Sequence, residues 1–372
     1  MKKLLDTTPA SAGVAHFSAA EEGFADAVVA WQKRHGRHAL PWQNTRDPYR
    51  IWLSEIMLQQ TQVATAIPYY QRFLQRFPDV AALAAAAPEE VMAHWSGLGY
   101  YSRARNLHRC AQRVVAEYGG RFPVDPGLLA ELPGIGRSTA AAIAAFSSGA
   151  RAAILDGNVK RVFCRVFGID GFPGERRVEE ALWLRAERLL PAAGMEAYTQ
   201  GLMDLGATIC TRSRPSCPQC PLAPRCVALA QDRVADLPAR KPKKTVPERH
   251  ASMLVLSHGD EVLLEQRPDS GIWGGLLSLP ELGADAGEAD VVALASRFGE
   301  AGDSERLSRF THVFTHFKLH VAPWRMRLRG RAGLASDGAH VWYPVARLED
   351  APLPAPVKKL LLAAFRSGDL LG

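Results

Sequence analysis

The spacing of apolar residues changes its period near residue 235. Before that point apolar positions recur at helical spacing, and runs of β-branched residues are few. After it come short runs typical of strands, such as 253–256 and 262–266, joined by the turn-forming residues 258–260. The sequence therefore predicts an all-helical region followed by a mixed α/β region.

A proline-rich basic segment, residues 235–250, separates the two regions. Its cationic side chains are Arg240, Lys241, Lys243, Lys244 and Arg249. This composition is typical of an extended linker, which is either a solvated tether or a segment that crosses a DNA backbone. Because 372 residues exceed one core, we expect a mobile tail over 1–18, a helical domain over 19–234 and an α/β domain over 251–372.

One helix start is encoded by Asp47 and Pro48, a capping carboxylate followed by a proline that fits the first turn. Further along this helix, Glu55 lies in the apolar run WLSEIML, residues 52–58. Burial there would raise the pKa of this carboxyl, as a general acid requires. On this segment alone, a glutamate at the edge of a packed face is the simpler interpretation.

A second pair of helices is predicted around the sequence PGIG at 133–136. A short helix from Asp125-Pro126 to Leu132 precedes it, and a helix from Arg137 to about Ser148 follows. Gly134 and Gly136 permit a tight turn whose outward amides grip a phosphate without reading sequence. We therefore predict a helix-hairpin-helix over about 125–149, although a plain turn between helices would have a similar sequence.

Asp156 follows the apolar residues 152–155 and precedes a helical run. This position is typical of a helix cap. An ionised carboxylate there could also face a sugar that becomes cationic as a base departs. A neutral carboxylic acid paired with a carboxylate breaks glycosidic bonds through an oxocarbenium-like transition state, so Glu55 and Asp156 are a candidate pair.

Four cysteines fall in the pattern C-x6-C-x2-C-x5-C: Cys210, Cys217, Cys220 and Cys226. Their unequal gaps favour a cubane iron-sulfur cluster. A structural zinc site is the nearest alternative, but zinc usually takes two C-x2-C knuckles. Disulfides would need an oxidising compartment, and neither an export signal nor a membrane span is recognisable, so we expect a soluble, cytoplasmic protein. Cys110 and Cys164 are expected to be small buried residues.

The charge balance makes a polyanion a reasonable partner, although it does not establish one. The net charge is +7, and 47% of the residues are hydrophobic, which is ample for packed cores. Arg105, Arg109 and Arg113 recur every fourth residue and form one basic stripe on a predicted helix. The stripe is either a solvated helix face or a phosphate-contacting one.

Several motifs in chain order resemble those of adenine DNA glycosylases of the MutY type. They are SEIMLQQT at 54–61, GLGYY at 97–101, LPGIGRST at 132–139, LDGN at 155–158 and the cysteine array. The match is dense over about 30–230 and looser towards the C-terminus. Endonuclease III, of the same superfamily, has a lysine where this chain has Ser138. Because a serine hydroxyl cannot form a Schiff base, Ser138 indicates hydrolysis without strand cleavage.

The resemblance implies roles for further residues of the helical domain. It makes Glu55 the acid that protonates adenine and helps to activate water, Asp156 the group that stabilises the sugar, and Asn158 a residue that organises the site. Gln60 and Tyr100 match residues that wedge into the duplex, which base extrusion requires. An aromatic packed on a neighbouring helix is the alternative for Tyr100.

Leu40 and Trp42 resemble the segment that lines the adenine pocket, although a Pro-Trp corner in a core would look the same. The cluster is expected to hold a basic loop against DNA, with cationic side chains at Arg212, Arg214 and Arg225.

Residues 251–372 resemble the MutT-like, Nudix-fold domain with which the family recognises 8-oxoguanine. The glutamate-rich helix that would hold magnesium in a hydrolase is missing, because the only glutamates between Gly283 and Gly302 are Glu288 and Glu300. The domain is therefore expected to recognise, not to hydrolyse. By resemblance its contacts to the oxidised guanine come from Phe314, Thr315 and His316, with threonine where serine is usual.

Two other features of this domain are assigned structural roles. His312, His316 and His320 would share one face of a strand, at spacings too wide for a single metal ion. The sequence GIWGG at 271–275 is interpreted as a structural loop.

Together these implications describe a monofunctional adenine DNA glycosylase with one 4Fe-4S cluster. Its partner would be double-stranded DNA containing A:8-oxoguanine or A:G mispairs, and we expect a monomer without membrane contact. The alternatives are an endonuclease III-like glycosylase and lyase acting on oxidised pyrimidines, and an iron-sulfur DNA-binding protein without chemistry.

Overall fold

The computed structural model describes residues 20–241, 246–268, 271–314, 316–332 and 339–366. The predicted mobile tail and Thr315 lie outside these ranges. The chain divides into two compact units, one formed by 1–46, 124–127 and 137–241, the other by 47–123, 128–136 and 242–372. The two units do not coincide with the predicted domains. The helical region 19–234 is divided between them, and the first unit combines segments from both ends of that region.

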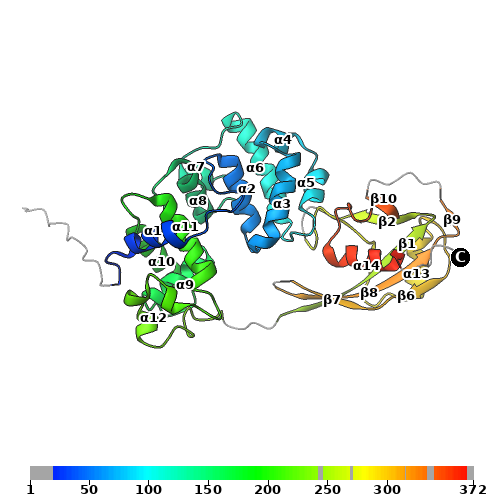
Figure 1. The fold of residues 1–372 in the computed structure, drawn as a ribbon. Helices are drawn as coiled ribbons and strands as arrows, with labels where there is room; N and C mark the ends of the chain where they lie inside the picture. Colours follow the sequence, from blue (N-terminus) through cyan, green and yellow to red (C-terminus); the bar gives the residue numbers. More distant parts are fainter. Residues whose placement is uncertain (1–19, 242–245, 269–270, 315, 333–338, 367–372) are drawn as a thin grey trace, which may run out of the picture. The chain divides into compact units, whose positions relative to one another are not determined.

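The first unit is helical (Figure 1). Its elements are α1 (Phe24–His35), α8 (Arg137–Ser148), α9 (Gly157–Val166), α10 (Arg176–Arg188), α11 (Met195–Asp204), the π-helix η1 (Leu205–Ile209), the 3-10 turns η2 (Cys217–Gln219) and η3 (Ala223–Arg225), and α12 (Val227–Ala230). The short helix α7 (Pro126–Ala130) leads into the hairpin before α8. Helices α8 and α9 confirm two elements predicted from capping and periodicity.

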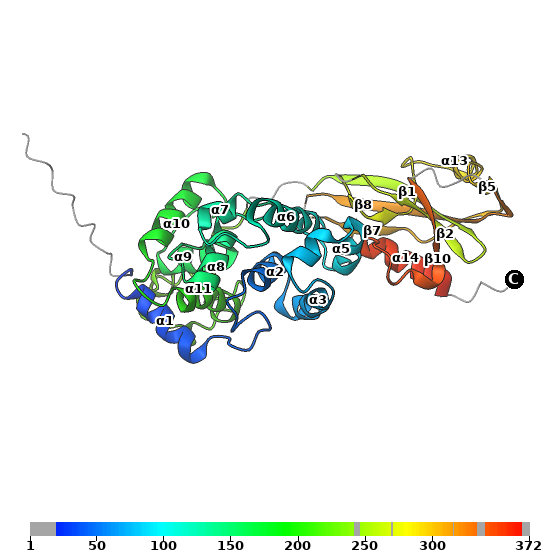
Figure 2. The same cartoon turned by 90° about the horizontal axis from the view of Figure 1, so that it is seen from above.

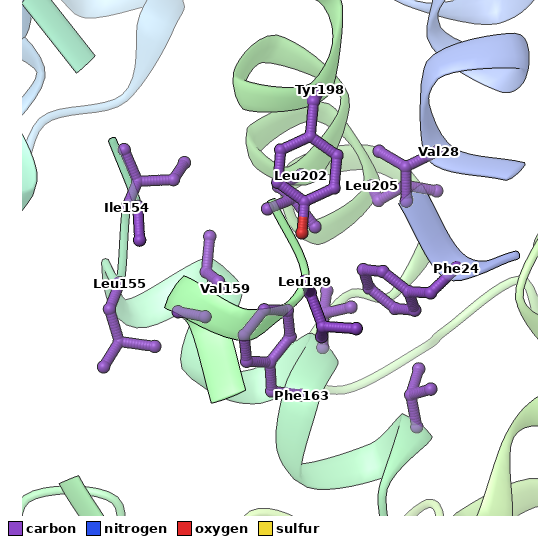
Figure 3. Packing of buried hydrophobic residues seen from close by; sticks show 14 of the residues in the cluster. Phe24, Val28, Ile154, Leu155, Val159, Phe163, Leu189, Tyr198, Leu202 and Leu205 are labelled. Carbon is purple, nitrogen blue, oxygen red and sulfur yellow. The ribbon is translucent and has the colours of Figure 1, made fainter. Parts of the chain in front are cut away.

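The core of the first unit joins α1, α9 and α11 (Figure 3). Phe24 packs edge-on against Phe163, with ring centroids 5.8 Å apart, and against Tyr198 at 6.4 Å. Ile154 and Leu155, in the extended segment before α9, are also buried in this cluster. The apolar residues that precede Asp156 therefore anchor the carboxylate to the core.

The helical part of the second unit comprises α2 (Pro48–Leu58), α3 (Val63–Arg76), α4 (Val80–Ala85), α5 (Pro88–Trp95) and α6 (Ser102–Tyr118). The α2 start is as predicted, because the Asp47 side chain accepts the Tyr49 N–H at 2.9 Å. Helix α6 packs on α2, α4 and α5 and ends at Gly119, whose φ of 59° closes it. Trp52, Phe73 and Trp95 are fully buried among these helices.

The rest of the second unit is a mixed sheet with two helices (Figures 1 and 2). Its elements are β1 (Glu248–His258), β2 (Glu261–Gln266), β3 (Leu277–Ser278), β4 (Glu281–Leu282), α13 (Glu288–Ala295), β5 (Gly299–Glu300), β6 (Ser304–Arg306), β7 (Phe310–Val313), β8 (Lys318–Arg327), β9 (Gly330–Arg331), β10 (His340–Pro344), the turn η4 (Val345–Arg347) and α14 (Ala355–Arg366). The central order is β10-β2-β1-β8-β6, and among the strands that the structure describes only β1 and β8 pair in parallel. Strand β1 begins inside the segment expected to be a linker.

The two helices lie on opposite sides of this sheet (Figure 2). Val291 and Ala295 of α13 pack against the face that carries Leu254 and Leu256. On α14, Val357 and Leu361 are fully buried. Alternation along β1 thus supplies apolar side chains to both faces, as a covered sheet requires.

Within the described ranges, no helix combines the length and the apolar character needed to cross a membrane.

Candidate active site and DNA-contacting loops

Asp156 ends an extended segment and caps α9. Its Oδ1 accepts the Val159 N–H at 2.8 Å, and its Oδ2 lies 3.4 Å from Nδ2 of Asn158. Burial raises the pKa of Asp156 above its usual range, while the hydrogen bonds from Val159 and Asn158 and the charge of Arg161 act in the opposite direction. The cap predicted from sequence is confirmed, and the same carboxylate is half-buried in a site that restrains both oxygens.

Ser138 lies in the first turn of α8 and contacts the segment that carries Asp156. Its Oγ accepts the Leu155 N–H at 2.9 Å. The hydroxyl thus accepts the backbone N–H of the residue that precedes Asp156. Ser138 was singled out from the sequence only because endonuclease III has lysine at this position. The hydrogen bond to Leu155 was not anticipated.

Asn158 is joined through Arg161 to the segment that begins the cysteine loop. Arg161 Nη2 donates to Asn158 Oδ1 at 2.9 Å and to the Gly206 carbonyl at 2.6 Å, and its Nε donates to the Cys210 carbonyl at 2.8 Å. Gly206 lies on η1, where an added Cβ would come within 2.4 Å of the Asn158 Cβ. The π-helix, a rare form often found at functional sites, brings its backbone against Asn158.

Arg165, one turn further along α9, holds the next part of the loop. Its Nη1 donates to the Thr211 carbonyl at 2.7 Å and lies 3.4 Å from Cys210 Sγ, and its Nε donates to the Leu237 carbonyl at 2.8 Å. The side chain is buried, with only 3% of its surface exposed. Neither Arg161 nor Arg165 was identified from the sequence. Their spacing of four, facing a predicted metal loop, was the available signal.

All four cysteines of the array line one pocket, together with apolar residues such as Val162, Leu205 and Leu222. None of the six cysteines forms a disulfide, and Cys110 and Cys164 are fully buried, as expected. The convergent donor set of four sulfurs fits a four-thiolate centre. Arg212 and Arg214 are exposed on this loop, whereas Arg225 donates to the Glu22 carbonyl.

Glu55 lies on α2 and is half-buried beside the fully buried Trp52 and Met57. Leu40 and Trp42 lie in the first unit, where Leu40 N–H donates to Gln43 Oε1 at 3.0 Å and Trp42 is 8% exposed. Glu55 and Asp156 belong to different compact units, so their pairing, like the adenine-pocket role of Leu40 and Trp42, stays a prediction.

Gln60 and Tyr100 share an uncommon backbone conformation. Gln60 has φ 58° and Tyr100 has φ 49°, in the left-handed region that disfavours residues other than glycine, asparagine and aspartate. Gln60 is exposed, and 46% of the Tyr100 side chain is accessible to solvent. Strained, exposed residues of this kind are a reason to suspect a functional role.

Arg103 contacts the residue before Gln60 and the residue before Tyr100, and it was not identified from the sequence. It shares the buried face of α6 with Leu107, Cys110 and Val114, at helical spacing. That periodicity would have separated it from the stripe of Arg105, Arg109 and Arg113.

The hairpin between α7 and α8 has the predicted glycine requirement at one position. Gly134 has φ 79°, and an added Cβ would lie 2.8 Å from the Asn106 Cβ. Gly136 has open space around its Cα, which would allow a close approach by another backbone. Arg109 is exposed and donates to Asn106 Oδ1 at 2.6 Å, so it lies near this hairpin.

The other two arginines of the stripe differ from Arg109. Arg113 forms an ion pair with Glu117 at 2.8 Å and donates to the Glu131 carbonyl at 2.7 Å, so its charge is compensated. Arg105 is half-buried. Helix α6 therefore does not present a uniform basic face.

Comparison with known proteins identifies the family. Residues 53–188 match the HhH-GPD superfamily of base excision DNA repair proteins, and residues 251–363 match the NUDIX domain. Adenine DNA glycosylase of Buchnera aphidicola subsp. Acyrthosiphon pisum is 36% identical over 339 residues, covering 91% of this chain and 96% of that protein. The human adenine DNA glycosylase is 32% identical, covering 91% and 73%. The chain belongs to the adenine DNA glycosylase family.

Membership confirms the expected fold class and makes the chain a DNA N-glycosylase of base excision repair. Among solved structures, a thermostable thymine-DNA glycosylase superposes with a TM-score of 0.52 at 30% identity, covering 57% of this chain and 97% of that one. The helical region thus has a fold in common with that thymine-DNA glycosylase.

In this adenine DNA glycosylase family member, the C-terminal sheet gathers an aromatic cluster at the end of β7. Phe314 stacks on Phe317 with centroids 4.4 Å apart and lies edge-on to His312 at 4.5 Å. Trp273 contacts Phe314 at 6.0 Å and has φ 55°. The loop at 271–275 therefore supports Phe314, a role that sequence reasoning did not assign, while His316 is exposed.

The expectation that His312, His316 and His320 share one face of a strand was wrong. The strand ends at Val313 and reverses, with the Phe314 N–H donating to the Phe317 carbonyl at 2.9 Å. In the β7–β8 register His312 is opposite Leu319, and His320 is opposite Thr311. Because neighbours along a strand alternate between faces, His312 and His320 lie on opposite faces of the sheet.

His320 instead lies beside His250 and Glu248. Its Nε2 is 3.3 Å from Glu248 Oε2, and its ring stacks on that of His250 at 4.8 Å with 21° between the planes. Potential ligand atoms of Glu248, His250 and His320 lie within 4.8 Å of one another, but the two imidazole rings are stacked and their planes do not point at one shared position in this conformation. Lys318 also pairs with Glu248 at 2.9 Å.

Proposed function

We propose that this glycosylase removes adenine opposite 8-oxoguanine or guanine by hydrolysis, without cutting the strand. The observation that carries the proposal is the site around Asp156. There a half-buried carboxylate is restrained by α9 and Asn158, and the adjacent Ser138 hydroxyl is already an acceptor for the Leu155 amide. The names of the relatives supply adenine as the base.

In this mechanism Glu55 protonates the adenine ring and makes it a better leaving group. The ionised Asp156 then stabilises the positive charge that develops on the sugar as the glycosidic bond breaks. Asn158 Nδ2 holds the second carboxylate oxygen, and Arg161 fixes the amide in turn. Water, which Glu55 helps to activate, completes the hydrolysis.

Strand cleavage would need an amine near the sugar, because a Schiff base forms only from a primary amine. Ser138 occupies the position at which endonuclease III has lysine. The lysine of α9, Lys160, donates to Glu179 Oε1 at 2.7 Å. This ion pair, together with Ser138, argues against the bifunctional alternative.

The cysteine pocket is proposed to hold one 4Fe-4S cluster. When bound, the cluster would supply structural cross-linking of the loop by four thiolates. Arg161 and Arg165 hold the Cys210 and Thr211 carbonyls on the α9 side, so the loop would connect the metal centre to the helix that Asp156 caps. The aromatic cluster around Phe314 is proposed to contact the oxidised guanine.

Base release from four duplexes tests the function. The wild type should release adenine from A:8-oxoguanine and A:G, but should act on neither A:T nor thymine-glycol duplexes. Glu55→Gln and Asp156→Asn should abolish release while leaving lesion-duplex binding largely intact. Asp79→Asn is a matched control, because Asp79 caps α4 by the same hydrogen bond, to Ala82 at 2.8 Å.

Borohydride trapping during turnover distinguishes the alternatives. Efficient trapping of a protein–DNA adduct through a lysine would show a lyase and contradict the role given to Ser138. Absence of released base from every duplex, with the metal centre intact, would instead show a binding protein without chemistry.

A further inference from the structure

One buried guanidinium connects two loops that are separate in sequence. Arg103 Nη1 and Nη2 donate within 3.2 Å to six oxygens, namely the carbonyls of Ile56, Met57, Gln59, Leu98 and Gly99 and the hydroxyl of Thr61. The carbonyls of Ile56, Met57 and Gln59 lie at the end of α2 or just after it, those of Leu98 and Gly99 lie just before Tyr100, and 7% of the arginine is exposed. This arrangement uses the planar fork of arginine, whose donors lie in fixed directions.

The charge of Arg103 is balanced by dipoles. The carbonyls of Ile56 and Met57 belong to the last turn of α2, where carbonyls lack the usual partner four residues on and the helix dipole is negative; Ile56 also accepts the Gln59 N–H, at 3.4 Å. The guanidinium also lies over the rings of Trp95, at 5.2 Å, and Tyr100, at 5.6 Å. Burial lowers the pKa of Arg103 to about 10, so the side chain stays charged at neutral pH.

Two of the carbonyls that accept from Arg103 belong to the residues immediately before the two left-handed ones. Gln59 precedes Gln60, and Gly99 precedes Tyr100, with Arg103 distances of 2.6 and 3.1 Å to these carbonyls. A left-handed conformation at such residues persists only where the surroundings fix it. The two peptide groups that set these conformations are therefore held by one side chain.

We infer that Arg103 is a positioning residue that locks Gln60 and Tyr100 into one rigid two-pronged unit for entering the DNA duplex. This inference rests on the proposed function, which places both residues at the DNA. Extruding a base costs stacking and pairing energy. Because the side chains of Gln60 and Tyr100, the two prongs, are already fixed before binding, they lose little conformational freedom when they enter the stack. The set of Arg103 hydrogen bonds, which we call the clamp, should therefore act on base extrusion and not on the chemical step.

The guanidinium also fixes the end of the helix that carries Glu55. Ile56 is the next residue after Glu55, and its carbonyl accepts from Arg103 at 3.0 Å. Because this contact lies one residue from the general acid, adenine release from an already unpaired adenine is the readout that shows whether a substitution at the clamp also disturbs Glu55.

The experiment measures base unstacking separately from release. The full chain carries Glu55→Gln, so that the base stays attached, and the duplex carries 2-aminopurine next to the mispair as a fluorescent reporter. Adding Arg103→Lys keeps the charge but leaves a single nitrogen in place of the fork. We expect the unstacking rate to fall by at least about ten-fold, because small misplacements of positioning groups have large kinetic effects.

Two comparisons separate positioning from a general loss of structure. Arg76→Lys is the matched control, because Arg76 is an exposed arginine of α3 that pairs with Glu90, and it should leave unstacking unchanged. In a Gln60→Ala, Tyr100→Ala background, adding Arg103→Lys should cause little further loss, because the prongs through which the clamp acts are gone. An additive loss would overturn the inference.

A milder variant covers the case in which Arg103→Lys does not fold. Thr61→Val removes one acceptor, at 3.2 Å from Arg103 Nη2, and keeps the side-chain shape. It should slow unstacking while thermal melting and adenine release from an already unpaired adenine stay near the wild type. Normal unstacking in both folded variants would refute the clamp. If the wild type unstacks the reporter but releases no adenine, the proposed function fails and the clamp stands.

Discussion

Ser138 and Leu155 are joined by a hydrogen bond from the Leu155 amide to the serine hydroxyl, 2.9 Å long. The bond ties the first turn of α8, directly after the hairpin, to the residue that precedes the candidate catalytic carboxylate. A position that the family resemblance makes a marker of reaction type is thus also a structural contact of the candidate active site.

Ser138→Ala should therefore reduce stability. The Leu155 amide would lose its acceptor in a partly buried place, which typically costs about 1–3 kcal/mol. Urea unfolding of the full chain measures the change. Ser147→Ala is the control within the same helix, since its hydroxyl donates to the Ile143 carbonyl, which helical bonding already serves. Equal effects of the two substitutions would show that the Leu155 contact is unimportant.

Asp156→Asn should become relatively more stable as the pH rises. Burial raises the folded-state pKa of Asp156 above that of the unfolded chain. The carboxyl therefore contributes stability below its unfolded pKa and loses that contribution as the pH rises through the folded value. Asparagine does not ionise and can still accept the Val159 N–H, so it avoids this loss.

Denaturant unfolding at a series of pH values, from about 3 to about 7, would measure the stability difference between Asp156→Asn and the wild type. Asp79→Asn, which removes a charge from an exposed cap, is the comparison. The same trend in both variants would show that burial of Asp156 is not the cause.

Cys217→Ser should lose the metal centre, whereas Cys110→Ser should retain it. Cys217 lines the pocket shared by the four cysteines, and Cys110 is fully buried on α6, where burial raises the pKa of its thiol to about 12. Iron and zinc analysis of the purified variants, with visible absorbance, measures the outcome. Zinc in place of iron in the wild type would favour the structural zinc alternative.

Gly206→Ala should impair base release. The added Cβ would lie 2.4 Å from the Asn158 Cβ, so either η1 or Asn158 must move. Overpacking of this kind costs about 1–3 kcal/mol, and the displacement would weaken the contact of Asn158 with Asp156. Single-turnover release and thermal melting measure the effect. Gly99 is unsuitable as a control position because its φ is 73°, and Gly136 is unsuitable because it is expected to contact DNA.

The exposed Gly283 provides the control for that experiment. Its surroundings are open, so Gly283→Ala should leave release unchanged. Normal release by Gly206→Ala would contradict the view that the close packing of η1 fixes Asn158.

Phe314→Ala should reduce the preference for 8-oxoguanine over guanine while leaving release from A:G duplexes near the wild-type rate. Its ring stacks on Phe317 and contacts Trp273 and His312, so removing it opens the aromatic cluster. The ratio of release rates on the two mispairs is the measurement. Val313→Ala, at an exposed neighbour, should not change that ratio.

Local sequence determined much of the helical region. Asp47 and Asp156 cap their helices as predicted, because a cap needs only a side-chain oxygen and the free amides of the next turn. The pair of helices around residues 133–136 and the convergence of four closely spaced cysteines on one pocket also follow from short-range spacing. Such features depend on neighbours within about a turn or loop, which the sequence itself supplies.

The tertiary structure decided which polar groups meet across long separations. Arg103 binds carbonyls more than forty residues away, Ser138 accepts the amide of Leu155, and the reversal after Val313 places His312 and His320 on opposite faces. Backbone carbonyls and amides are present at every position and leave no mark in residue type. A side chain that binds them can therefore be recognised only after folding has brought the two segments together.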